Sequence, residues 1–134
     1  LRRPDVLHAA IAGAPVTDWR LYDTHYTERY LGHPGTEPAN YEISDLCTEP
    51  AQMGDTSMRP LLLIHGLADD NVVAAHTLQL SRALLEAGKP HTVLPLSGVT
   101  HMTPQEEVAE ILLLLKLSSL VETLGQPNGG RSVV

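Results

Sequence analysis

The sequence contains little cysteine, little positive charge and no phenylalanine. Its single cysteine, Cys47, excludes an internal disulfide and a cysteine metal cluster, and it favours a reducing compartment such as the cytoplasm. Sixteen acidic residues against nine basic ones give a net charge of −7, which argues against a general affinity for nucleic acids or membranes. The 134 residues suffice for one small globular domain.

Motifs for membrane insertion, nucleotide binding and metal binding are also absent. No apolar run reaches the length of a membrane span, and no signal-peptide pattern is present, although any leader would lie upstream of Leu1. Because Leu1 is not a methionine, we expect the chain to be a piece of something longer. No phosphate loop or dinucleotide fingerprint occurs, so no cofactor is expected. No metal is expected either, because the spacing of a metal site is missing among His8, His25, His33, His65, His76 and His91.

Three apolar segments predict β-strands. Residues 6–16 form an almost continuous apolar run closed by Pro15, which is typical of a strand buried on both faces. A short buried helix is the alternative for this segment. Two further strands are predicted at residues 60–66 and 91–98. Because three strands make too small a sheet, we expect the sheet to be incomplete and to continue before Leu1.

Helical patterns alternate with these strands. The alternation predicts an α/β fold in which parallel strands carry covering helices. We expect this domain to span residues 1–124, and residues 125–134 to form a disordered tail. The helices are predicted over residues 17–32, 74–88 and 103–124.

Two local signals refine this prediction. Thr103 followed by Pro104 indicates the N-cap and the first position of the last helix. The polar region at residues 33–60 is predicted to be a loop with one short helix near Ser44 to Cys47.

Ionisable residues follow the second and third predicted strands. Asp69 and Asp70 come directly after residues 60–66. His101 follows residues 91–98, and the carboxyl ends of parallel strands lie at one edge of a sheet. There an aspartate can orient a histidine that acts as a base, and this chain order matches the second half of an α/β hydrolase. Taken separately, the aspartates are better explained as helix N-caps and His101 as a solvated loop residue, and only their joint placement favours the catalytic interpretation.

A nucleophile for such a base is missing. Neither Ser44 nor Ser57 lies in a Gly-x-Ser-x-Gly turn between a strand and a helix. Cys47 lies in a loop with no strand before it. The chain therefore offers an acid and a base without the group that they would activate.

Four aromatic residues recur at helical spacing. Trp19, Tyr22, Tyr26 and Tyr30 are three, four and four residues apart, which places them on one face of a helix. A stripe that faces the core and a face that binds a ligand are both consistent with this pattern.

Three segments of the sequence resemble a known family. The strings APVTDWRLYDTHYTERYLG, LLLIHGLADDNV and SGVTHM resemble the C-terminal part of the catalytic domain of the prolyl oligopeptidase family, and its dipeptidyl-peptidase IV-like branch most closely. The resemblance covers residues 4–122. It implies the C-terminal portion of an α/β-hydrolase fold and a serine peptidase that acts on peptides. It further implies that Asp69 and His101 are the aspartate and the histidine of a catalytic triad.

The resemblance also implies a substrate pocket. It places Asn71 at a backbone carbonyl of the substrate and leaves Tyr30 as a structural residue. Aromatic and apolar walls suit a flat proline ring, which is commonly the residue before the scissile bond in this family. The walls of the pocket are implied to be Val16, Trp19, Tyr22 and Tyr26.

The family's serine is not among these residues. In the family it lies in a Gly-x-Ser-x-Gly-Gly turn, which would fall about ten residues before Leu1. The first half of the hydrolase domain and an N-terminal propeller would also lie upstream. We therefore expect the chain to need this N-terminal part as its partner and to be inactive alone. Dipeptidyl cleavage and other peptidase activities both stay open.

Two other functions are compatible with the residues. A non-catalytic relic could bind peptides or a partner through its aromatic face and its open sheet edge, and such an edge favours association, including a homodimer. An esterase of the α/β-hydrolase type would share the aspartate and the histidine, but it gives no reason for the tyrosines.

Overall fold

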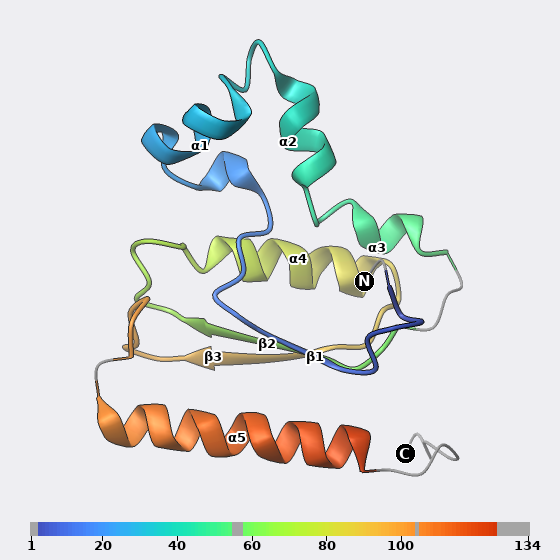
Figure 1. Ribbon diagram of the computed structural model, residues 1–134, viewed down its shortest axis with the longest axis vertical. Helices are drawn as coiled ribbons and strands as arrows, with labels where there is room; N and C mark the ends of the chain where they lie inside the picture. Colours follow the sequence, from blue (N-terminus) through green and yellow to red (C-terminus); the bar gives the residue numbers. More distant parts are fainter. Residues whose placement is uncertain (1–2, 55–57, 104, 126–134) are drawn as a thin grey trace.

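A three-stranded parallel sheet forms the centre of the computed structural model, which describes residues 3–54, 58–103 and 105–125 (Figure 1). The strand order is β1-β2-β3, the same as the order in the chain. Ala10 pairs with Leu61, and Leu62 pairs with Thr92. The strands are β1 (Ala10–Gly13), β2 (Leu61–Gly66) and β3 (Thr92–Leu96).

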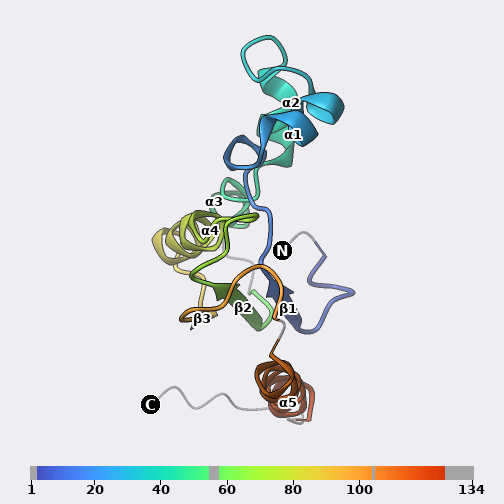
Figure 2. The same ribbon diagram turned by 90° about the vertical axis from the view of Figure 1, so that its left-hand side faces the viewer.

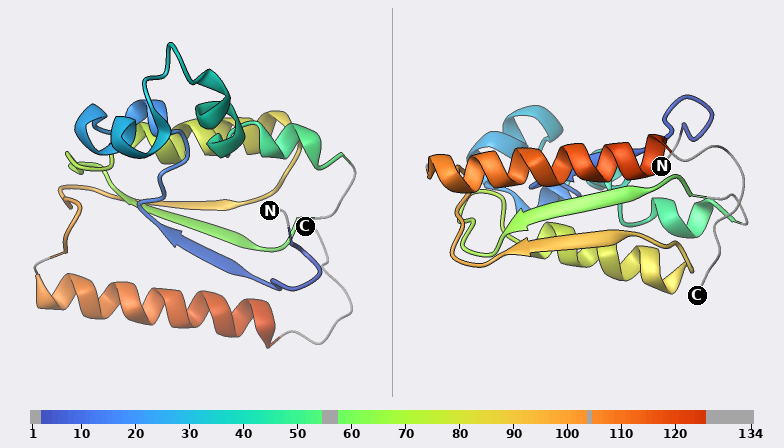
Figure 3. Two further views of the ribbon diagram at one scale, coloured as in Figure 1. Left: turned by 45° about the horizontal axis from the view of Figure 1, so that its top comes forward. Right: turned by 90° about the horizontal axis from the view of Figure 1, so that it is seen from below.

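Helices cover both faces of the sheet. Figures 1 and 2 show α4 (Ala75–Glu86) on one face and α5 (Glu106–Leu124) beneath the other. The other helices lie between β1 and β2 in the chain, and Figure 3 shows them on the side of α4. They are the 3-10 helix η1 (Trp19–Leu21), α1 (Thr24–Leu31), α2 (Pro38–Ser44) and α3 (Glu49–Gln52). The predicted α/β architecture with parallel strands and covering helices is confirmed.

The core lies between the sheet and α4. Leu63 of β2 packs against Leu80 and Leu84 of α4, and all three are buried. Leu80 and Leu84 are four residues apart, so they lie on the same face of the helix. This packing holds α4 against the sheet.

The first strand is shorter and more exposed than predicted. The prediction gave residues 6–16 buried on both faces, but β1 spans four residues, and Ala10, Ile11 and Ala12 are only half-buried. Val6 and Leu7, before the strand, are more than half exposed. Within the described residues β1 pairs only with β2, so its other edge has no strand partner among them.

The helix predicted over residues 17–32 is divided in two. The Asp18 side chain accepts a hydrogen bond from the Arg20 backbone and starts η1. The Asp23 side chain accepts one from the Tyr26 backbone at 2.8 Å and starts α1. Each aspartate acts as an N-cap, which requires a non-helical backbone and so interrupts the predicted helix.

The short helix predicted near Ser44 to Cys47 is also wrong. Instead α2 ends at Ser44 and α3 begins at Glu49, with a proline in the first turn of each helix. Between them the Asp45 side chain accepts a hydrogen bond from the Cys47 backbone at 2.8 Å, a local turn that competes with a helix.

The last helix begins later than predicted. It starts at Glu106, and the residue before it is Gln105, so Thr103 is not its N-cap. Gln105 has the extended backbone of a capping residue, and two glutamates in the first turn suit the positive end of the helix dipole. Pro104 and residues 126–134 of the tail predicted at residues 125–134 lie outside the described residues.

Helix α5 is apolar around its whole circumference. Such a helix is usually covered on all sides. No helix in the described part of the chain is long and apolar enough to cross a membrane. The exposed apolar residues of α5 are Ile111, Leu113, Leu114, Leu115, Leu117, Val121 and Leu124.

Candidate active site

The acid and the base predicted from the sequence lie together at the carboxyl edge of the sheet. Asp69 lies in the loop after β2 and His101 in the loop after β3. The His101 Nδ1 atom is 3.0 Å from the Asp69 Oδ2 atom. An ionised carboxylate only accepts, so Nδ1–H donates and Nε2 keeps its lone pair. This tautomer can take a proton from a nucleophile at Nε2.

The Asp69 carboxylate is buried and fully supplied with donors. Its Oδ1 atom accepts from the backbone N–H groups of Asn71 at 3.0 Å and Val72 at 2.9 Å. Burial alone raises the pKa of Asp69, but the hydrogen bonds from His101, Val72 and Asn71 outweigh it and lower the pKa. Asp69 is therefore ionised at neutral pH. Asp70, its neighbour in the chain, is exposed.

The depressed pKa of Asp69 predicts an acid-dependent loss of stability. The contribution of Asp69 is present above its unfolded pKa, near 3.8, and is lost as the pH falls through the lower folded value. We expect the free energy of unfolding, measured by urea denaturation, to fall below about pH 4 in wild type and to fall less steeply in Asp69→Asn. Equal slopes would show that the Asp69 pKa is not depressed.

A second histidine, His65 at the end of β2, contacts the Asp69 loop. The His65 Nε2 atom is 2.7 Å from the Val72 carbonyl oxygen and 3.6 Å from Asp69 Oδ2. A carbonyl only accepts, so Nε2 carries the proton. The Nδ1 atom then accepts from the Thr77 hydroxyl, whose oxygen is 2.7 Å from it. His65 thus joins the loop to α4. We did not predict this role, although a polar residue at the end of an apolar strand was a signal for it.

Gly66 lets the two loops touch. A Cβ atom at this position would lie 2.3 Å from the Val99 carbonyl oxygen and 2.9 Å from that of Thr100. The Ala68 backbone donates to the same Val99 oxygen at 3.1 Å. The loop that carries His101 therefore lies directly on the loop that carries Asp69, and only glycine leaves room for this contact.

The aromatic residues form a contact cluster beside the Asp69 loop. Trp19 stacks on Tyr26 with 6.0 Å between ring centroids, and Tyr22 meets both rings edge-on. Tyr30 contacts Tyr26 at 5.0 Å. Tyr26 and Tyr30 are 47% and 65% exposed, so the cluster is not a core stripe. Tyr41, the remaining aromatic residue, is the buried one.

One hydrogen bond joins the aromatic cluster to the Asp69 loop. The Tyr22 hydroxyl donates to the Asn71 Oδ1 atom at 3.1 Å. This leaves the Asn71 Nδ2 group available as a donor. Val16 is half-buried in the segment that enters the cluster. The structure thus brings Trp19, Tyr22, Tyr26 and Asn71 together.

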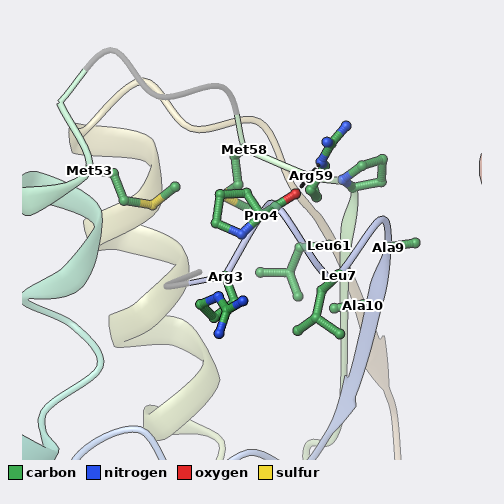
Figure 4. A pocket seen from close by; sticks show the side chains of 10 residues that line it. Arg3, Pro4, Leu7, Ala9, Ala10, Met53, Met58, Arg59 and Leu61 are labelled. Atoms are coloured by element: carbon green, nitrogen blue, oxygen red, sulfur yellow. Dashed lines mark hydrogen bonds between the residues drawn. The ribbon is translucent and has the colours of Figure 1, made fainter. Parts of the chain in front are cut away.

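A small cavity in the described part of the molecule lies away from Asp69 and His101. Figure 4 shows a cavity of about 60 Å³ whose lining includes Arg3, Leu7, Met58 and Leu61. It opens at the amino end of β2, opposite Asp69, and is too small for a peptide. Among the described residues no group of histidine, cysteine, aspartate or glutamate side chains is placed to hold a metal ion.

Comparisons with known proteins place the chain in one family. The model of the prolyl oligopeptidase family matches residues 1–126. Dipeptidyl peptidase 8 of Mus musculus and that of Homo sapiens are 40% identical over the whole chain, and dipeptidyl peptidase 4 of Sus scrofa is 43% identical over 62% of it. The chain spans 15% of the length of the two dipeptidyl peptidases 8 and 11% of the pig protein.

A solved structure agrees with this assignment. The crystal structure of Porphyromonas gingivalis dipeptidyl peptidase 4 superposes with a TM-score of 0.80 and 31% identity, over 87% of this chain and 16% of that one. The sheet and helices described above therefore correspond to part of an α/β-hydrolase domain, as the sequence predicted. The chain belongs to the prolyl oligopeptidase family.

Proposed function

We propose that these residues form the acid–base half of a serine peptidase active site. His101 takes the proton of a serine hydroxyl at Nε2, and Asp69 orients the imidazole and stabilises its charged form. The serine would come from a segment outside residues 1–134. The observation that carries the proposal is the 3.0 Å contact between a buried carboxylate and a partly exposed histidine at neighbouring strand ends.

The electrostatics support these roles. Asp69 keeps its charge despite burial because three hydrogen bonds stabilise the carboxylate. A charged Asp69 makes the imidazolium of His101 more favourable when the proton arrives. The His101 side chain is 36% exposed, so its ring is accessible to a nucleophile from outside these residues.

The aromatic cluster supports a preference for proline or a small residue before the scissile bond. Trp19, Tyr22 and Tyr26 offer ring faces and edges. The half-buried Val16 would add an apolar wall. The free Nδ2 group of Asn71 would donate to a backbone carbonyl of the substrate and fix its direction. The relatives are named dipeptidyl peptidases, which supports release of dipeptides as the reaction of the complete protein.

Tyr22→Phe tests this arrangement. The substitution removes the hydrogen bond to Asn71 but keeps the ring in the cluster. A hydrogen bond contributes about 0.5–1.5 kcal/mol net, so we expect KM of the complete protein for a proline peptide to rise about two- to tenfold with little change in kcat. Tyr30→Phe is the control, because the Tyr30 ring contacts the cluster at its edge. Equal KM values for both variants would contradict the role of Asn71.

Comparing residues 1–134 with the complete gene product tests the proposed function directly. We expect the complete protein to hydrolyse dipeptidyl amides with proline before the scissile bond. Residues 1–134 alone should show no hydrolysis, because the base has no nucleophile. If residues 1–134 alone hydrolyse the substrate and a serine-reactive inhibitor abolishes this activity, the proposal that the serine lies outside these residues is refuted. An inactive complete protein would refute the peptidase itself.

The apolar surface of α5 favours a second candidate, a non-catalytic binding module. Its exposed leucines and the open edge of β1 are surfaces that proteins usually cover with a partner. This candidate predicts binding of peptides without hydrolysis. It gives no reason for the contact between Asp69 and His101, so we rank it second.

A further inference from the structure

One buried histidine has no part in the chemistry proposed above. His76 lies in the first turn of α4 and is fully buried. It comes four residues after Val72, whose backbone holds the Asp69 carboxylate. Thr17, which is also fully buried, lies against it from the segment that leads into the aromatic cluster.

His76 is bonded to this segment by three hydrogen bonds. Its Nδ1 atom is 3.2 Å from the Thr17 backbone nitrogen and 3.4 Å from that of Asp18. The Thr17 hydroxyl donates to the His76 carbonyl oxygen at 2.8 Å. Backbone N–H groups only donate, so Nδ1 must carry its lone pair, and one ring atom accepts from two donors.

This arrangement requires a neutral imidazole with its proton on Nε2. If Nδ1 were protonated, its N–H group would point at the backbone N–H groups of Thr17 and Asp18, and neither could donate to it. Burial lowers the pKa of His76, and the charges of Asp18 and Asp69 do not outweigh it, while His65 acts in the same direction as burial. The buried Nε2 atom has no hydrogen-bond partner among the described residues. Leucine would avoid that unsatisfied group, so the Nδ1 acceptor is what the polar ring supplies.

The consequence lies in the position of the aromatic cluster. Thr17 and Asp18 directly precede Trp19, and α4 directly follows the loop that holds Asp69. His76 therefore connects the segment that leads into the rings to the helix that follows the Asp69 loop. A second tie between the cluster and the loop, from Tyr22 to Asn71, joins a half-buried side chain to an exposed one.

We propose that His76 is a positioning residue for substrate specificity, which holds the aromatic cluster in register with the active site through its Nδ1 acceptor. This inference rests on the proposed peptidase function. It concerns binding of the residue before the scissile bond and not the proton transfer. Its loss should therefore change KM, most of all for proline, whose ring needs the aromatic walls.

Three substitutions in the complete gene product separate the two ring nitrogens. His76→Leu removes both nitrogens. His76→Asn keeps an acceptor where Nδ1 stands, and His76→Gln places its amide where Nε2 stands. The kinetics use two dipeptidyl amide substrates, with proline or alanine before the scissile bond. Thermal unfolding of each variant is followed by circular dichroism.

For His76→Leu we expect KM for the proline substrate to rise about tenfold, because the substitution removes one to two shared hydrogen bonds. The value of kcat should stay within about twofold of wild type. KM for the alanine substrate should rise less than KM for the proline substrate. His76→Asn should restore KM to within about threefold. An unchanged KM in His76→Leu, or the absence of rescue by His76→Asn, would overturn the proposal. If His76→Leu does not fold, the comparison is between the other two variants. A KM close to wild type in both His76→Gln and His76→Asn would then overturn the proposal.

A second measurement is independent of catalysis. Nitrogen NMR of labelled histidine, with the His76 signals assigned from their absence in His76→Asn, reports which ring nitrogen carries the proton. We expect Nδ1 bare and Nε2 protonated. A protonated Nδ1 would overturn the positioning role. Wild type that hydrolyses neither substrate while His76 keeps a bare Nδ1 would refute the peptidase and leave the tie between α4 and the cluster in place.

Discussion

Replacing Asp69 by asparagine in the complete protein is expected to lower kcat by about 10⁴-fold, with KM almost unchanged. Asparagine can keep the bonds from the Asn71 and Val72 backbones through its oxygen. It then presents an NH₂ group to His101, which forces His101 Nδ1 to accept and moves the imidazole proton to Nε2. In that tautomer His101 cannot take a proton from a serine.

Asp70→Asn is the matched control for this experiment. Asp70 has the same charge and lies next in the chain, but it is exposed. We expect its kcat to stay within about twofold of wild type, as for most surface substitutions. Steady-state kinetics on a dipeptidyl amide substrate measure both variants. Similar losses in the two variants would mean that general charge, and not the contact with His101, controls the rate.

Gly66→Ala is expected to abolish most of the activity and to destabilise the fold. The added Cβ atom would stand 2.3 Å from the Val99 carbonyl oxygen, so the backbone of one loop must move. Overpacking of this kind costs about 1–3 kcal/mol. A displacement of about 1 Å between acid and base lowers the rate about a hundredfold. Thermal unfolding and kcat measured on the same preparation separate the two effects.

Gly13→Ala is the control for the glycine prediction. Gly13 ends β1, and a Cβ atom there would meet nothing within 4 Å. Its stability and kcat should stay close to wild type. If Gly66→Ala behaves like Gly13→Ala, the two loops do not depend on the close contact at Gly66.

The parts of the fold that the sequence predicted are those set by local patterns. The apolar runs of β2 and β3 lie where they were expected, and the alternation with helices gave the parallel order. The same reasoning placed Asp69 and His101 at one edge, because residues that follow parallel strands meet there.

The errors in the helices between β1 and β2 arose where a side chain bonds to a nearby backbone. Asp18 and Asp23 each start a new helix, so the aromatic residues at regular spacing come from η1, α1 and the residues between them. The rings still touch, because the two short helices follow each other closely. Helical periodicity registers the spacing of apolar groups but not such a competing cap.

Contacts over long sequence distances were invisible from the sequence. His76 and Thr17 are 59 residues apart, and nothing local marks His76 as different from the other scattered histidines. In the sequence Gly66 is only the last residue of a predicted strand. Its contact with the Val99 loop becomes visible only in the folded chain. Both residues have a role only through elements that folding brings together.

The central claim is that Asp69 and His101 activate a serine supplied from outside residues 1–134. The most direct test labels the complete gene product with a fluorophosphonate and locates the modified residue by mass spectrometry. We predict one modified serine, in a Gly-x-Ser-x-Gly-Gly segment before Leu1, with labelling slowed strongly in Asp69→Asn and unchanged in Asp70→Asn. No labelled serine, a label within residues 1–134, or equal rates in the two variants would contradict the claim.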